Sequence, residues 1–126
     1  MTELDKLAKY LKENKIPFER YDCDEKYNED DLMITLDRHQ ICVPKWGENC
    51  KWDAICHKGS YGYERGLLEI YGEIVPYNEN GDSVIGFLTA EQVIKHIKPW
   101  HESLKNRIKE RVKESIKEII FDEWYN

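Results

Sequence analysis

Hydrophobic and polar residues alternate with a period of two in the middle of the chain, which predicts β-strands there. The runs 51–57 and 67–75 alternate most clearly, with apolar positions on one side and more polar positions on the other. Such alternation is typical of an antiparallel sheet that has one buried and one wetted face. Shorter strand-like runs at 41–43 and 83–88 are separated from them by turn residues, so we expect one sheet between residues 41 and 88.

The segment before this sheet is harder to interpret, because its polar and apolar residues are unevenly spread. Residues 22–31 are acidic and poor in large apolar side chains, which indicates a solvated loop. The carboxylates of this run do not follow the spacing of a calcium-binding loop. Residues 32–36 are a strand candidate, and residues 37–40 are expected to turn that strand into the run 41–43 as a hairpin.

Helical periodicity flanks the strand region on both sides. An apolar stripe over residues 2–14 predicts an N-terminal helix. Thr89 and Gln92 form a capping-box pattern that predicts a short helix ending at Pro99. Residues 100–124 predict the longest helix, whose apolar residues recur mostly every fourth position, a spacing that drifts around a straight helix. These residues are Leu104, Ile108, Val112, Ile116, Ile119, Ile120 and Trp124.

These elements predict an α+β fold with an N-terminal helix, a mainly antiparallel sheet of four or five strands, and two C-terminal helices, the last one long. A chain of 126 residues is expected to form a single domain. Within it we expect residues 1–98 to form the α+β core and residues 99–126 the long amphipathic helix. The helix either packs on its own sheet or also contacts a partner.

Composition and charge narrow the functional classes. The net charge of -6 disfavours non-specific binding to duplex nucleic acid, because that affinity depends on neutralising phosphates. No run approaches the length of a membrane span, and the first residues lack the apolar core of a secretory signal. We therefore expect a cytoplasmic protein with no membrane partner. In that compartment its four cysteines are expected to be free thiols. They are Cys23, Cys42, Cys50 and Cys56.

Metal and nucleophile chemistry based on these cysteines is disfavoured. Cys42, Cys50 and Cys56 are separated by eight and six positions, whereas zinc knuckles place two cysteines three to five positions apart. Cys56 and His57 are neighbours on a predicted strand, so their side chains point to opposite faces. No family signature surrounds a cysteine that would pair it with a histidine as a nucleophile. We predict no metal site among these residues and no cofactor.

One pair of carboxylates suggests an enzymatic alternative. Asp53 and Glu69 fall in two predicted strands that a sheet could bring together on one face, where two carboxylates could hold Mg²⁺ and activate water. The order of elements and the pattern D…E-x-Tyr resemble the restriction-endonuclease-like nucleases, whose motif is D…(D/E)-x-K. Tyr71 occupies the position of the motif lysine, so the usual cation beside the attacking water is missing. The resemblance covers about twenty residues.

Aromatic residues cluster around the predicted turns and strands. Trp46, Trp52, Tyr61 and Tyr63 are candidates for stacking on single-stranded bases, with nearby lysines supplying charge. Aromatic residues also favour strands and bury large areas, so packing in the core and in hairpins is the competing interpretation.

Two segments carry a second resemblance. The runs WDAICHKGSYGYERGLLEIYGEIV and DSVIGFLTAEQVIKHI resemble a family of small uncharacterised proteins encoded by bacteriophages and prophages of low-GC Gram-positive bacteria. The resemblance covers roughly residues 36–98 and implies a bacterial host cytoplasm as the setting. It implies no activity and no catalytic residue.

The sequence therefore favours a phage accessory protein that acts through protein contacts, over the nuclease alternative that would use Mg²⁺ with Asp53, Glu69 and Tyr71. We expect a protein partner or a homo-oligomer. The expected self-association surface is the apolar stripe of the last helix, which consists of Leu104, Ile108, Val112, Ile116, Ile120 and Trp124.

Overall fold

The computed structural model describes residues 1–28, 33–76 and 83–125, and these form two compact units. The first unit is Met1–His96 and the second is Ile97–Asn126. The first contains both sheets, the N-terminal helix and the first turns of the last helix, whereas the second contains only helix. Among the described residues, no helix is long and apolar enough to span a bilayer.

The N-terminal helix α1 (Glu3–Glu13) has the position and the apolar stripe that the sequence predicts. It begins with a reciprocal cap. The Thr2 hydroxyl accepts a hydrogen bond from the amide of Asp5 at 3.1 Å, and the Asp5 carboxylate accepts one from the amide of Thr2 at 2.9 Å. The helix buries Leu4, Leu7, Ala8 and Leu11.

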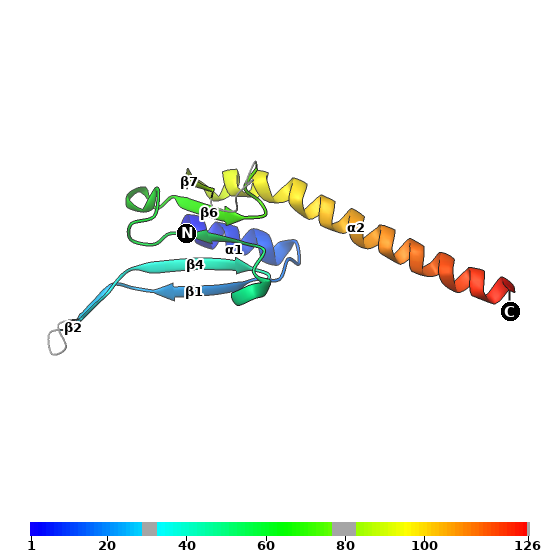
Figure 1. The fold of residues 1–126 in the computed structure, drawn as a ribbon. Coiled ribbons are helices and arrows are strands. Elements are labelled where there is room, and N and C mark those ends of the chain that lie inside the picture. The colour runs from blue at the N-terminus through cyan, green and yellow to red at the C-terminus, as the bar shows by residue number, and fades with distance from the viewer. Residues whose placement is uncertain (29–32, 77–82, 126) are drawn as a thin grey trace. The chain divides into compact units, whose positions relative to one another are not determined.

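The main sheet has five antiparallel strands, a number within the predicted range. A strand at residues 19–23 was not predicted, and the strand predicted at residues 32–36 belongs to a separate sheet. The five strands are β1 (Glu19–Cys23), β4 (Arg38–Val43), β5 (Trp52–Ile55), β6 (Leu68–Gly72) and β7 (Val84–Leu88). Their order in the sheet is β1-β4-β5-β6-β7, so that β4 lies beside β1 and β6 beside β7 (Figure 1).

One face of this sheet forms the core. Cross-strand pairs such as Ile41 with Ala54 and Ala54 with Ile70 place the apolar positions of neighbouring strands next to one another. These side chains are buried together with the stripe of α1 and with Val93. Burial of such an apolar layer is the main driving force for this fold. The opposite face, called the open face below, presents the other residues of each strand. It includes Tyr21, Arg38, Gln40, Asp53, Glu69, Tyr71 and Val84, and also Cys42, whose side chain is buried at 3% exposure.

The prediction for residues 22–43 was wrong in its pairing. Instead of a loop, the acidic run includes the end of β1 and the strand β2 (Lys26–Asn28), which pairs with β3 (Met33–Thr35). Instead of folding back on β3, β4 pairs with β1 and β5. In the β1–β4 pair Glu19 lies opposite Cys42, and in the β2–β3 pair Lys26 lies opposite Thr35. Both pairs are antiparallel and have no register shift. Exposed strands tolerate charged residues, which is why polarity alone suggested a loop.

The prediction of two C-terminal helices was also wrong. A single helix, α2 (Ala90–Tyr125), runs through Pro99. Proline removes one backbone hydrogen bond and crowds the preceding turn, but residues that favour helices surround it on both sides. The predicted cap is present, since Thr89 accepts from the amide of Gln92 at 3.2 Å and Gln92 accepts from the amide of Thr89 at 2.9 Å.

Candidate functional site

A cavity of about 560 Å³ lies in the first unit, between the start of α1, the strands β1 and β4, and the 3-10 turn η2 (Tyr63–Arg65). Its polar lining is dense. Carboxylates from four separate segments line it together with a histidine, an arginine and a tyrosine. The lining includes Thr2, Asp5, Arg20, Asp22, Asp24, Asp37, His39 and Tyr63.

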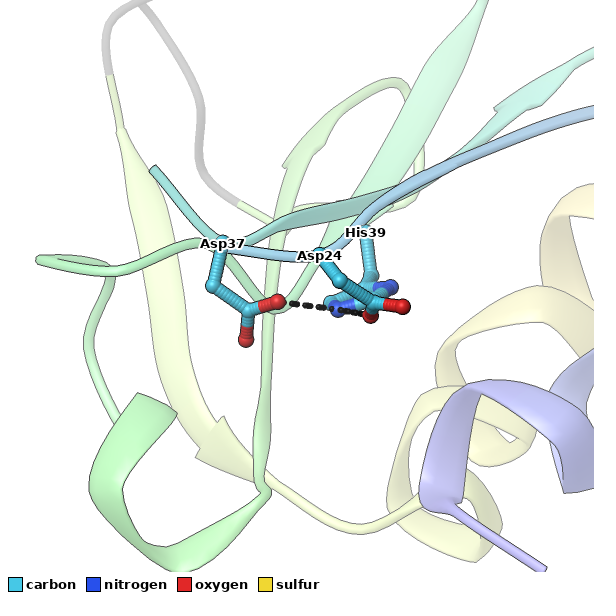
Figure 2. A group of neighbouring side chains, drawn as sticks. All are labelled: Asp24, Asp37 and His39. Carbon is cyan, nitrogen blue, oxygen red and sulfur yellow. Dashed lines mark hydrogen bonds and ion pairs between the residues drawn. The ribbon is translucent and has the colours of Figure 1, made fainter. Parts of the chain in front are cut away.

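His39 is at the centre of this polar group. Its Nδ1 lies 2.7 Å from a carboxylate oxygen of Asp22, and its Nε2 lies 2.8 Å from a carboxylate oxygen of Asp37. A carboxylate oxygen of Asp24 lies 3.9 Å from the same Nε2. Figure 2 shows Asp24 and Asp37 beside the His39 ring, with the contact from Asp37 drawn as a dashed line. The imidazole therefore connects two carboxylates, and a third lies near.

Neighbouring groups hold these side chains in position. The Tyr63 hydroxyl donates to the second carboxylate oxygen of Asp37 at 2.8 Å. The backbone amide of His39 donates to Nδ1 of His57 at 3.0 Å, which fixes the start of β4 against the segment after β5. Arg20 reaches the carboxylates of Asp5 and Asp22, each at 2.8 Å. The cluster is thus a connected network rather than a set of independent surface charges.

The network determines the protonation of its members. Desolvation lowers the pKa of His39, but hydrogen bonds to Asp22 and Asp37 and the charges of both acids outweigh it, so the pKa is raised above 6.5. The hydrogen bond from Tyr63, followed by that from His39, lowers the pKa of Asp37. Desolvation and the charges of Arg38 and His39 lower the pKa of His57. The ring of His39 thus holds a positive charge between acids to a higher pH than a free histidine does.

The same atoms could serve as metal ligands in a second protonation state. Asp24, Asp37 and His39 each offer one ligand atom, and these three atoms lie within 4.8 Å of one another. Among the described residues, these three form the group of potential metal ligands. Once Nε2 loses its proton it can donate its lone pair to a cation, while Asp22 on Nδ1 fixes the ring orientation, as carboxylates do behind metal-bound histidines. While Nε2 keeps its proton, the imidazolium of His39 supplies one positive charge beside these acids.

Sequence reasoning did not single out this cluster. The sequence predicted Asp22 and Asp24 to lie in a solvated loop, and Asp37 and His39 to lie in a turn between two strands. A usable signal is the spacing of Asp37 and His39, because residues two apart at the edge of a strand share a face. The contribution of Asp22 and Asp24 depends on the pairing of β1 with β4, which the predicted hairpin did not include.

The residues of the nuclease alternative lie together on the open face. Asp53 is the cross-strand partner of Tyr71, and Glu69 is the partner of Ile55, so the two acids are diagonal neighbours. Desolvation raises the pKa of Asp53 to about 6, a hydrogen bond from Gln40 at 2.8 Å opposes this rise, and the charge of Glu69 adds to it. Asp53 and Glu69 belong to no group of three metal-ligating residues within the described ranges.

The four aromatic binding candidates are found in different environments. Trp52 is 1% exposed and lies in the core, so it offers no surface for stacking, which corrects its proposed role. Tyr63 is half-buried and donates to Asp37. Trp46 and Tyr61 are exposed; Trp46 contacts Tyr21 edge to face, and Tyr61 lies beside Phe87.

The apolar stripe of α2 is largely accessible where its side chains are described. Ile108, Val112 and Ile116 are 54%, 52% and 51% exposed, and Leu104 is half-buried. The side chains of Ile120 and Trp124, also predicted to belong to this surface, lie outside the described part of the chain.

Comparison with known proteins adds no relative to these observations. No protein-family model, no curated protein and no solved structure matches the chain.

Proposed function

We propose that this protein is a non-enzymatic accessory protein that acts through protein contact, and that α2 is its contact surface. The form of contact that we propose is self-association. The phage or prophage setting belongs to the same proposal and has its support in the two segments quoted above.

The observation that carries this proposal is the accessibility of three aliphatic side chains at equal spacing on one helix. Ile108, Val112 and Ile116 each expose about half of their surface. From Lys98 to Ile116 no described side chain is buried. Contiguous apolar groups that remain exposed are typical of interaction sites, because burying them on association is favourable.

The test is the effect of a charge placed in the centre of the stripe. At concentrations where both proteins are monomeric, Val112→Glu in the full chain should leave secondary structure and thermal stability unchanged, because the side chain is half exposed. It should weaken association at least tenfold in sedimentation velocity. The matched control is Glu110→Gln, which changes a residue on the opposite side of the helix. Equal sedimentation of wild type and Val112→Glu across all concentrations would contradict the proposal.

A second candidate function is the metal-dependent nuclease. Its support is the shared face of Asp53 and Glu69 together with the raised pKa of Asp53, because perturbed pKa values of this kind cluster at functional sites. Plasmid nicking with Mg²⁺ or Mn²⁺ should then be present in wild type and absent in Asp53→Ala. Activity that persists in Asp53→Ala would exclude this site.

A further inference from the structure

The sequence of α2 contains a repeat of four residues that defines its surface chemistry. Residues 102–117 read ESLK-NRIK-ERVK-ESIK, so each tetrad has an aliphatic residue third and a lysine fourth. At about 100° per residue, the lysines lie on one side of the apolar row and the second positions, Arg or Ser, lie on the other. Three of the four first positions are acids, Glu102, Glu110 and Glu114, and they lie on the opposite side of the helix. The apolar row therefore has cationic residues on both flanks.

This arrangement disfavours packing of two α2 helices against each other. If the apolar rows of two copies met, the cationic flanks of one helix would face the cationic flanks of the other in both the parallel and the antiparallel orientation. Flanking charges of one sign oppose such pairing, whereas stable helix pairs place opposite charges there. The complementary surface should combine apolar or aromatic groups with acids.

The open face of the main sheet has this chemistry. It carries the carboxylates of Glu19, Asp53 and Glu69, and the guanidinium of Arg38 lies at one end. Among them are aromatic rings that are substantially exposed, Tyr21 at 46% and Tyr71 at 43%. Aromatic faces also attract lysine and arginine through their quadrupoles.

The shapes of the two surfaces also agree. A row of residues four apart advances about 40° beyond a full turn at each step, so the apolar row winds around α2 in the right-handed sense. Strands twist in the right-handed sense along their own axes. A twisted sheet can therefore stay in contact with the whole winding row, whereas a straight helix would lose contact at its ends. Leu104 to Ile116 spans about 18 Å, close to the roughly 17 Å of a strand of five residues.

We propose that the apolar row of α2 in one copy docks on the open face of a second copy, with its lysines and arginines against Glu19, Asp53 and Glu69. This inference rests on the self-association proposed above and specifies its second surface. The contact is heterologous, so it closes into a dimer if docking is reciprocal and otherwise extends into a chain of copies.

Complementation between two full-length variants tests this pairing. Val112→Glu removes the helix surface and Tyr71→Lys places a cation on the open face. Each variant alone should associate at least tenfold more weakly than wild type in sedimentation velocity at low salt. An equimolar mixture should recover a dimer, because the Tyr71→Lys copy still has an intact helix and the Val112→Glu copy an intact face. Tyr27→Lys, an exposed tyrosine of β2, is the matched control and should behave as wild type.

The outcomes separate the two proposals. If Val112→Glu is monomeric while Tyr71→Lys associates as wild type does, helices pair with each other, so the docking inference is wrong and self-association stands. If wild type is monomeric at every concentration, self-association fails and the docking inference fails with it. Circular dichroism and thermal melts equal to those of wild type, recorded at a concentration where wild type is monomeric, confirm that both variants fold.

Discussion

At the scale of single residues, His39 determines how the acidic cavity responds to pH. Because its pKa is raised in the folded chain, its charged form stabilises the fold below pH 6.5, and that contribution is lost as pH rises through the folded pKa. We expect His39→Gln to lose about 1–2 kcal/mol of unfolding free energy at pH 5.5 and little at pH 8.5, since charged hydrogen bonds to Asp22 and Asp37 are removed. Urea denaturation at the two values measures this.

His57 also makes the stability of the protein depend on pH. The quantity to compare is therefore the difference in unfolding free energy between wild type and His39→Gln at each pH. The pKa of His57 is lowered, so its contribution has the opposite sign and is lost as pH falls. His96→Gln is the control, because His96 is outside the cavity lining. A loss of stability in His39→Gln that is the same at both pH values would show that its packing, rather than its charge, stabilises the fold.

At the scale of elements, the start of α2 depends on α1. The backbone amide of Ala90 donates to the Glu3 carboxylate at 2.6 Å, and this bond is the main reason that the pKa of Glu3 is lowered. We expect Glu3→Gln to reduce stability by about 1 kcal/mol at pH 7, because a carboxylate at a helix N-terminus is favourable. A carboxyl with a lowered folded pKa stabilises above its unfolded value, 4.5 here, and loses this effect as pH falls through the folded pKa. The melting temperatures of wild type and Glu3→Gln should therefore differ at pH 7 and become more alike at pH 3. Glu13→Gln is the control.

The elements also show which parts of the fold the sequence could predict. α1, β5, β6 and β7 follow from local periodicity, because each has one buried face that selects apolar residues at alternate or helical spacing. Polarity gave the wrong result for β2, which lies in the acidic run that was predicted as a loop. The strand β3 was predicted, but its pairing with β2 was not. Pro99 was taken as a helix end, although the surrounding helix formers continue α2 through it. The His39 cavity required the β1–β4 pairing, which is a long-range property that no local pattern contains.

At the scale of the whole molecule, the two units should differ in how strongly their backbone is protected. The first unit has a buried core, whereas no described side chain between Lys98 and Ile116 is buried. Amide exchange slows where tertiary packing must be broken to expose the backbone. In a dilute solution of monomers we therefore expect slow exchange in β5, at Ala54 for example, and fast exchange across residues 100–116.

Association should reduce this difference in amide protection as the protein concentration rises. A helix that is covered only in the assembled state gains stability as the fraction of assembled copies rises. Protection of residues 100–116 should thus increase with protein concentration in wild type and stay low in Val112→Glu, while that of Ala54 follows global stability. High protection of residues 100–116 that does not vary with concentration would mean that the helix is stabilised within its own chain. The interpretation in which α2 packs on its own sheet would then replace the one in which it binds a second copy.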